Sequence, residues 1–355
     1  MNKQNILALA LKPAMRVTRS VGIGIVLLLA AALIAIITPS AASAPPPCDG
    51  PTATRLVTGL EGASGSTIGP DGALYVTEGA VGRISRVDPQ TGEKTIFASG
   101  LPPAIISIGG FSIGGPIDVA FIDNVAYALV TLVSPDVGGS DVDGIYRIDA
   151  PDSFTVVAGI DAFNVANPPP TPFDVPTGLQ FALQTFRGGF LVTDGHLNRV
   201  LRVTLDGEIT VLIAFDNIVP TGLEVRGNTI YMAEAGPVPH LPENGKVVSF
   251  GPNSPTATEV ASGAPLLVDV EFGGGRLYAL SQGIFPVGSP PATPALPNTG
   301  ALVKVNGDGT FTVITDSLDR PTSLEFIGNT AYVVTLGGEI WKIDDVSGPP
   351  YGVSR

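Results

Sequence analysis

The sequence contains a single cysteine, Cys48, among 355 residues. One cysteine excludes an intramolecular disulfide and a metal site built from cysteines. Pro47 stands before it, where a lipoprotein signal has a small residue such as Gly or Ala, so the sequence disfavours lipidation. Only 14% of the residues are charged, and there are two histidines. No nucleophile elbow, P-loop or dinucleotide-binding fingerprint occurs, so none of these enzyme classes is indicated.

Basic residues are also scarce. The formal net charge is −13, with 19 Lys and Arg against 32 Asp and Glu. All the acidic residues follow Cys48, whereas Lys3, Lys12, Arg16 and Arg19 precede it. An acidic chain is a poor partner for nucleic acid or anionic lipid, because both are polyanions. The composition fits cations, sugars, small neutral ligands, or solubility alone.

The first 44 residues have the order of a secretory signal. Basic residues come first, Val21–Ile37 is an uninterrupted apolar or glycine run, and small residues follow, with a cleavage site after Ala42. The alternative is an uncleaved anchor, since the run is near the lower limit of about 17 residues for a membrane span. Residues 1–44 are therefore expected to be a signal peptide or an N-terminal anchor with a short spacer. In both cases the remainder is secreted, periplasmic or in the cell envelope of a bacterium, and contacts a membrane only through an uncleaved N-terminal segment.

After the signal, the chain is rich in turn residues, with 44 Gly and 33 Pro in the whole sequence. Between the turns run short alternating apolar segments, which is the pattern of β-strands. These segments recur as a unit of four strands, here called a, b, c and d. Six copies begin at Gly65, Ile117, Pro176, Pro220, Val268 and Pro321.

The last copy lacks strand d, because the repeat ends after Glu339–Asp344. Thr54–Gly59 has the pattern of a strand d and precedes the first strand a. It can complete the last unit and close the ring, which removes the exposed edge of an open stack. The sequence therefore predicts an all-β, six-bladed β-propeller of four-stranded blades over residues 45–355.

These repeats resemble the NHL and gluconolactonase-like group of six-bladed propellers. The resemblance lies in the P-x-G motifs Pro176–Gly178 and Pro220–Gly222, the PDGxLYVTE segment Pro70–Glu78, and the I-x-R-[VI]-D pattern of strand c. The stretch Gly59–Gly92 is similar to the ScyD/ScyE family of exported propellers. The resemblance covers about residues 50–345 and implies the fold, but implies little about the chemistry.

Three long insertions, Thr131–Asp143, Pro237–Asn244 and Gln282–Thr299, all join strand b to strand c. In a propeller these loops rise from the same face as the connections from strand d to the next strand a. Loops gathered on one face favour a binding face for a small molecule, a glycan or a protein. The alternative is that exposed Gly- and Pro-rich loops tolerate insertions anywhere.

Strand a lines the central channel, and its polar positions are acid-rich. The first channel-facing residues are Gly65, Asp118, Gly178, Gly222, Asp269 and Ser323. Two residues further on stand Thr67, Ala120, Gln180, Glu224, Glu271 and Glu325. Asp118 and Asp269 belong to opposite blades. With Glu224 and Glu271 they are candidate ligands of calcium or another divalent cation, because converging carboxylates repel unless neutralised. The alternative is a water-filled channel with solvated carboxylates.

The resemblance implies a metal near this place and, with it, a metal-assisted hydrolase or lactonase. The Asn ligand of that group is not evident in this sequence. A second catalytic hypothesis rests on His196 and His240, which follow strand b in neighbouring blades, beside Asp194 and Glu234. Such a group can supply general acid and base, as in streptogramin lyases. The alternative is that both histidines are idle loop residues.

Asp141–Gly144 resembles the start of a calcium loop, but a turn into a strand fits better.

The basic residues of strand c are interpreted as structural. The basic residues recur at one position and are expected to pair with neighbouring acids: Arg86, Arg147, Arg202, Lys304 and Lys342. The sequence thus favours a binding propeller, with a metal-assisted hydrolase and a His-based lyase as alternatives. It does not decide whether the protein is an enzyme.

Overall fold

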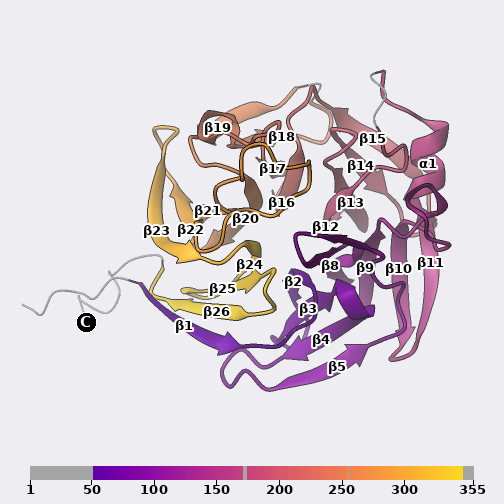
Figure 1. Cartoon of the computed structure of the whole chain (residues 1–355), viewed down its shortest axis with the longest axis horizontal. Helices are drawn as coiled ribbons and strands as arrows, with labels where there is room; N and C mark the ends of the chain where they lie inside the picture. Colours follow the sequence, from indigo (N-terminus) through magenta and orange to yellow (C-terminus); the bar gives the residue numbers. More distant parts are fainter. Residues whose placement is uncertain (1–50, 171–173, 255, 347–355) are drawn as a thin grey trace, which may run out of the picture. The chain divides into compact units, whose positions relative to one another are not determined.

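The computed structural model describes residues 51–346, except 171–173 and 255. Six four-stranded antiparallel sheets surround a central axis (Figure 1). This confirms the predicted all-β, six-bladed propeller. Residues 1–44 and Cys48 lie outside the described residues. In the described part of the chain, no helix has both the length and the apolar character needed to cross a bilayer.

The strands follow the predicted order a, b, c, d in five blades. Blade one contains β2 (Ala63–Ile68), β3 (Leu74–Glu78), β4 (Arg83–Val87) and β5 (Lys94–Ala98). Blade two contains β8 (Gly115–Ile122), β9 (Val125–Thr131), β10 (Gly144–Ala150) and β11 (Ser153–Gly159). Blade three contains β12 (Gln180–Phe186), β13 (Gly189–Asp194), β14 (Arg199–Val203) and β15 (Ile209–Ala214). Blade four contains β16 (Pro220–Arg226), β17 (Thr229–Glu234), β18 (Lys246–Phe250) and β19 (Thr258–Ser262). Blade five contains β20 (Leu267–Gly273), β21 (Arg276–Ser281), β22 (Gly300–Val305) and β23 (Phe311–Leu318).

Blade six is closed by the N-terminal strand. Its strands are β24 (Pro321–Ile327), β25 (Thr330–Thr335) and β26 (Ile340–Asp344), and β1 (Thr52–Val57) pairs with β26. The two lie side by side in Figure 1, as the indigo and yellow ends of the described chain. The predicted closing strand, Thr54–Gly59, is therefore confirmed, with its bounds two residues earlier. Val57 is buried and packs with Leu60 and Ile340.

The hydrophobic core is divided among the six junctions between blades. Six clusters of buried residues each join two neighbouring blades. Between blades one and two, for example, Tyr75 and Ile84 pack with Val119. Both faces of strands b and c are covered in this way, since a blade alone cannot bury its two apolar faces. Closure of the ring is what completes the sixth junction.

Two connections from strand d to strand a contain elements that the sequence pattern did not indicate. Between blades one and two, β6 (Ile106–Ile108) and β7 (Phe111–Ile113) form a hairpin through Gly109 and Gly110. Both glycines have positive φ, which suits a tight hairpin turn. Between blades two and three lies helix α1 (Ile160–Ala166), which is too short for a helical period to be visible. The described residues also contain three short 3-10 helices: η1 (Gly79–Val81), η2 (Pro135–Val137) and η3 (Pro242–Asn244).

The third copy of the repeat begins four residues later than predicted. Leu183 pairs with Val192, as Leu223 pairs with Met232 in blade four. The channel-facing residues of blade three are therefore Ala182 and Gln184, and the predicted Gly178 and Gln180 are wrong. The motif Pro176–Gly178 ends a turn instead, closed by a hydrogen bond from Gly178 N–H to Val175 O of 3.0 Å. Pro176–Gly178 has the same sequence as Pro220–Gly222, but it precedes its strand a, whereas Pro220–Gly222 is part of strand a.

Candidate functional site

Two cavities lie along the central channel. The mouth cavity, of about 420 Å³, opens on the face of the b–c loops. Its walls are largely apolar, with Ile113, Ile117, Phe181, Val219, Leu266 and Val268. The inner cavity, of about 230 Å³, lies further along strands a and contains Glu271 and Glu325. Asp118, Ala182, Asp269 and Ser323 line both cavities and form the neck between them.

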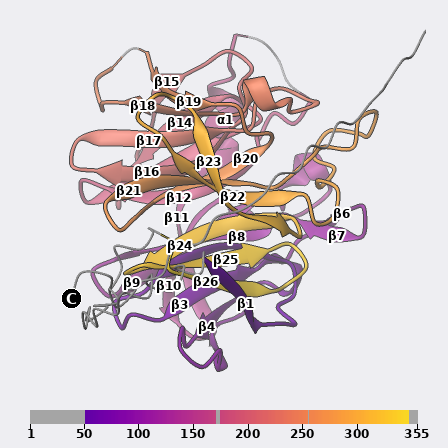
Figure 2. The same ribbon diagram turned by 90° about the vertical axis from the view of Figure 1, so that its left-hand side faces the viewer.

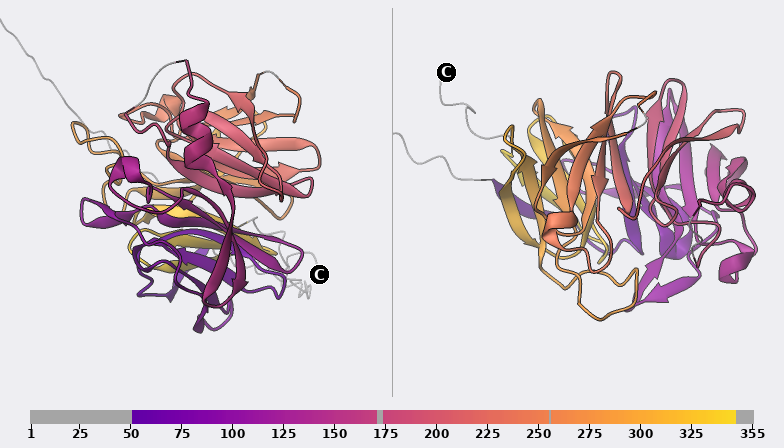
Figure 3. Two further views of the ribbon diagram at one scale, coloured as in Figure 1. Left: turned by 90° about the vertical axis from the view of Figure 1, so that its right-hand side faces the viewer. Right: turned by 90° about the horizontal axis from the view of Figure 1, so that it is seen from above.

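The β6–β7 hairpin and the 282–299 loop contribute walls of the mouth cavity from two different blades. Both project on the same side of the ring (Figures 2 and 3), and Ser112 and Pro294 both line the cavity. Arg320 connects them: its guanidinium lies 5.0 Å from the ring centre of Phe111, and Nε donates to Ala295 O at 2.7 Å. These contacts define the opening of the mouth cavity. The β6–β7 hairpin was not predicted from the sequence.

Two of the three predicted long loops line the mouth cavity. Val238 and His240 belong to the 237–244 loop, and Gln282 begins the 282–299 loop. The third loop, Thr131–Asp143, instead joins blade two to blade three through hydrogen bonds. Asp136 Oδ2 accepts from Thr177 Oγ1 at 2.7 Å, in the connection that leads to blade three. Within the loop, Ser134 Oγ donates to Asp143 Oδ2 at 2.7 Å. Asp143 thus serves the turn into β10, as the sequence indicated.

Asp118 and Asp269 occupy equivalent positions in opposite blades. Asp118 accepts Val119 N–H at 2.8 Å and, from the next blade, Leu183 N–H at 2.7 Å. Asp269 accepts Val270 N–H at 2.8 Å and Leu324 N–H at 2.7 Å. Burial raises the pKa of Asp118 well above its ordinary value and that of Asp269 to about 7, against the effect of these hydrogen bonds. Each carboxyl therefore joins two inner strands while facing the neck.

Glycine stands beside each of these aspartates in the preceding blade. A Cβ added at Gly65 would overlap Asp118 Oδ1, and one at Gly222 would lie 2.5 Å from Asp269 Oδ1. Only glycine allows this close approach of the inner strands. The ring thus repeats the same arrangement in its two halves, with Gly65 and Asp118 in one and Gly222 and Asp269 in the other.

The second channel-facing position of strand a is acidic in one half of the ring only. Glu224, Glu271 and Glu325 take one position in blades four to six, where blades one to three have Thr67, Ala120 and Gln184. Burial raises the pKa of all three glutamates, and repulsion from Glu325 adds to the shift of Glu271. At this position, Thr67, Ala120 and Gln184 of blades one to three are all uncharged, so none of them provides a basic counter-charge.

The predicted cation site was Asp118, Asp269, Glu224 and Glu271. Among the residues that the structure describes, no three His, Cys, Asp or Glu side chains are grouped so as to hold a metal ion. Both oxygens of Asp118 and of Asp269 already accept backbone N–H groups. The arrangement does not fit a compact carboxylate ligand set, and calcium in the channel stays a prediction from the sequence.

His196 and His240 both line the mouth cavity. His240 is buried, its Nδ1 lies 2.7 Å from Gly236 O, and its ring packs edge-on against Phe285. A carbonyl oxygen can only accept, so Nδ1 carries the proton. His196 Nε2 accepts Val175 N–H at 3.2 Å. Burial lowers the pKa of both histidines, so both are neutral near pH 7. The structure brings the two predicted histidines to one cavity, but uses a ring nitrogen of each to hold a loop.

The acids predicted to act with these histidines do not line the cavity. Asp194 is fully buried and accepts from Asn164 Nδ2 at 2.6 Å and from Leu197 N–H at 2.9 Å. Glu234 is 5% exposed, and burial raises its pKa to about 7. Opposite it, Lys246 donates to Glu259 at 2.7 Å. Asp194 is thus a structural residue that holds its loop, and Glu234 is a buried residue that does not line the cavity.

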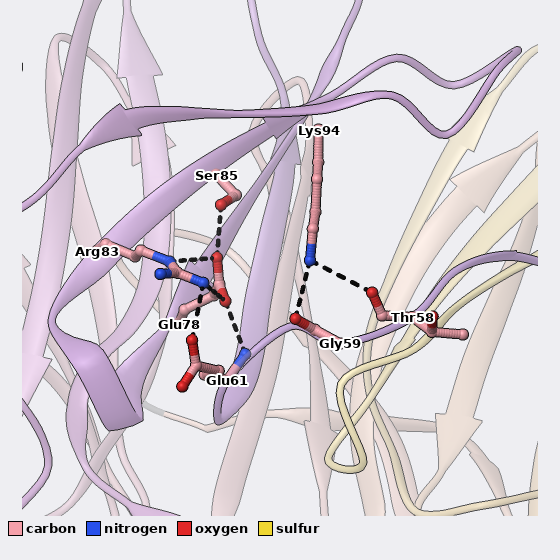
Figure 4. Close-up of polar contacts among 7 residues, drawn as sticks. All are labelled: Thr58, Gly59, Glu61, Glu78, Arg83, Ser85 and Lys94. Carbon is pink, nitrogen blue, oxygen red and sulfur yellow. Dashed lines mark hydrogen bonds and ion pairs between the residues drawn. The ribbon is translucent and has the colours of Figure 1, made fainter.

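Glu78, the equivalent acid of blade one, shows what this position does (Figure 4). It accepts from Arg83 Nη2 at 2.7 Å, from Ser85 Oγ, and from Glu61 N–H at 2.6 Å. Burial alone would raise the pKa of Glu78, but the hydrogen bonds from Arg83 and Ser85 bring it below its ordinary value. In blade one, the acid at the end of strand b therefore joins strand c to the incoming d–a connection.

The basic column of strand c is structural, as predicted, where ion pairs form. Arg86 pairs with Asp71 at 2.6 Å and Arg147 with Asp149 at 2.7 Å. Lys342 lies 3.3 Å from Asp344. These pairs are at the surface, where solvent screening leaves ion pairs little effect on stability.

Comparisons with known proteins agree on the fold. No protein-family model and no curated protein matches the chain. Among solved structures, a gluconolactonase from Xanthomonas campestris is 13% identical, with a TM-score of 0.55, over 87% of this chain and 99% of that one. The PQQ-bound aldose sugar dehydrogenase of Streptomyces coelicolor is 14% identical, with a TM-score of 0.55, over 83% and 98%. A virginiamycin B lyase from Staphylococcus aureus with quinupristin is 15% identical, with a TM-score of 0.51, over 83% and 98%.

At these identities the likeness shows the fold alone. The structural neighbours are six-bladed propeller proteins, gluconolactonase-like proteins among them. They differ in what they act on, so the shared fold does not choose among their activities.

Proposed function

We propose that this protein is an exported, ScyD/ScyE-like propeller that binds a small, largely apolar molecule in the mouth cavity. The observation that carries the proposal is the cavity itself: about 420 Å³ with apolar walls and a polar neck. This is within the usual size range of small-molecule sites, about 300–1,000 Å³. Glycan and protein ligands are less well supported, because the apolar walls offer few of the hydrogen bonds that a glycan needs.

The neutral environment-sensitive dye Nile red tests this proposal. It is expected to bind the purified protein with one site per chain and a blue-shifted emission. Ile113→Trp narrows the cavity from the β6–β7 hairpin and is expected to weaken binding about tenfold, roughly 1.4 kcal/mol. The matched control is Ile96→Trp on the outer strand β5, where Ile96 is 62% exposed; its affinity should equal that of the wild type. Equal affinities of all three proteins would refute binding in the cavity.

A His-based lyase is the second candidate, favoured by the one observation that His196 and His240 share the cavity. Neutral imidazoles are suited to general base chemistry near pH 7. The remaining nitrogen of His240, Nε2, is the atom available for it. If His240→Gln and His196→Gln both retain full turnover of a substrate identified for the protein, the lyase is ruled out. The metal-assisted hydrolase has no comparable support, because the described carboxylates form no ligand group.

A further inference from the structure

The neck is where the apolar mouth cavity meets the acidic inner cavity. Asp118 and Asp269 line both cavities, and Glu271 and Glu325 line the inner one. Among the described residues that line either cavity, none is Lys or Arg. A molecule in the mouth cavity therefore meets apolar walls on its sides and uncompensated carboxyl groups at its inner end.

The carboxyl groups of the neck are positioned before any ligand arrives. Backbone N–H groups hold both oxygens of Asp118, and likewise both oxygens of Asp269. Each carboxyl group retains acceptor capacity for a further hydrogen bond, since a carboxylate has about four acceptor sites. The wall residues Ser64, Thr322 and Ser323 are neutral and bring no positive charge to the neck.

We propose that the ligand is an organic cation: an apolar body in the mouth cavity with one protonated amine or similar head at the neck between Asp118 and Asp269. This rests on the proposed function, since it names the ligand class of the same site. A cationic head matches the carboxyls by charge and, through N–H groups, by hydrogen bonding. An apolar body would pack against the apolar walls of the mouth cavity, whereas a bare metal ion would make no use of them.

Proton release is a consequence of this assignment. Burial and mutual repulsion raise the pKa of the neck and inner-cavity carboxyls. A bound cation favours their ionised forms and so lowers these pKa values, and protons leave as the ligand binds. By linkage, affinity for a permanently charged ligand should rise between pH 5 and pH 8.

Three probes with one aromatic body and different heads test the assignment by calorimetry: naphthylmethylammonium, naphthylmethanol and naphthoate. The ammonium is expected to bind about ten- to a hundredfold more tightly than the alcohol, and naphthoate more weakly than either. Asp269→Asn should remove the preference of the ammonium over the alcohol. Asp152→Asn makes the same charge change at an exposed turn and should leave the preference intact. Because Asp269→Asn can disturb the neck, the wild-type protein provides a second test: heats measured in two buffers should show protons released with the ammonium and none with the alcohol.

Other outcomes separate this inference from the proposed function. Equal affinities for ammonium and alcohol, with Nile red still bound in the cavity, would overturn the cation assignment and leave the cavity function standing. Loss of all probes and of Nile red would overturn both. A fall in ammonium affinity of more than tenfold in CaCl2, but not in NaCl of equal ionic strength, would assign the neck to a divalent metal ion and overturn the organic cation. Unchanged affinity in CaCl2 is the expected result.

Discussion

Asp118 and Asp269 each join two inner strands through hydrogen bonds. In the preceding blade, a glycine beside each aspartate leaves room for its carboxyl group. Gly222 lies against Asp269 so closely that a methyl group would be 2.5 Å from its Cα and Oδ1. Asp269 is held on its other side by Leu324 N–H. The position of the neck carboxyl therefore depends on the absence of a side chain in the neighbouring blade.

Gly222→Ala is expected to destabilise the fold, because neither strand a can move without breaking contacts across its junction. Overpacking of this kind costs about 1–3 kcal/mol. The measurement is the urea-unfolding midpoint. Gly307→Ala is the control: a Cβ there meets nothing within 4 Å. If the two variants have equal midpoints, the close approach of Gly222 to Asp269 does not affect the stability of the fold.

Glu234 provides a test of an unpartnered buried acid. Its pKa is raised to about 7 from 4.5, so the folded state favours the protonated form. The corresponding stability is fully present below about pH 4.5 and is lost as pH rises through 7. Glu234→Gln is therefore expected to raise the free energy of unfolding at pH 8 by on the order of 2–3 kcal/mol and to change it little at pH 4.5.

The control for that variant is Glu208→Gln, at an exposed position. It should leave the pH dependence of unfolding unchanged. A Glu234→Gln protein that is less stable than the wild type at pH 8 would show instead that ionised Glu234 is stabilised by Lys246.

At the scale of elements, β1 closes the ring by pairing with β26, far away in sequence. Val57, at its end, is 6% exposed within the core between blades six and one, whereas Thr54 on the same strand is exposed. The strand is therefore held both by its hydrogen bonds and by apolar side chains, of which Val57 is the most buried. Its loss would leave β26 as an open edge and one junction uncovered.

Val57→Asp is expected to lower stability by several kcal/mol, since it buries a charge without a partner, and Thr54→Asp should have little effect.

Trp341, the only tryptophan, lies on β26 opposite Arg55 of β1. Its fluorescence and the far-ultraviolet circular dichroism should change together in urea if the ring unfolds as a unit. A fluorescence change well before the dichroism change would show that β1 detaches independently.

At the scale of the molecule, carboxyl groups with opposite pKa shifts set an optimum pH. The neck and inner-cavity acids have raised pKa values. Their contribution to folding stability is therefore present in mild acid and is lost as pH rises through about 7, the pKa of Asp269. Glu78 and Asp71 have lowered pKa values, because hydrogen bonds from Arg83 and Arg86 outweigh the effect of burial. Their stability is present above the ordinary values and is lost in strong acid.

The protein is therefore expected to be more stable at pH 5 than at pH 8, and to lose stability again below about pH 4. The net charge of −13 acts in the same direction on the alkaline side, through self-repulsion. Unfolding midpoints in urea at pH 3.5, 5 and 8 at constant ionic strength measure this. A midpoint at pH 8 equal to or above that at pH 5 would contradict it.

The repeat alone determined the architecture of this protein. Alternating strands with turns between them repeat six times, and a displaced strand d precedes the first copy, so blade number, closure and the face of the long loops followed from local pattern. Asp118 and Asp269 were placed in opposite blades by the same count. Such features depend on neighbours in sequence and on the periodicity of strands.

The tertiary structure decided the register of blade three and the roles of the polar residues. Pro176–Gly178 and Pro220–Gly222 have the same letters, but the buried Asp194 and the pairing of Leu183 place the first motif in a turn. Asp194 holds its loop partly through Asn164, 30 residues away on helix α1, and no local pattern reveals that contact. The mouth cavity likewise depends on a hairpin and a loop from different blades, joined by Arg320. Cavities and hydrogen bonds between blades arise only when the ring closes, and so the site, unlike the fold, required the structure.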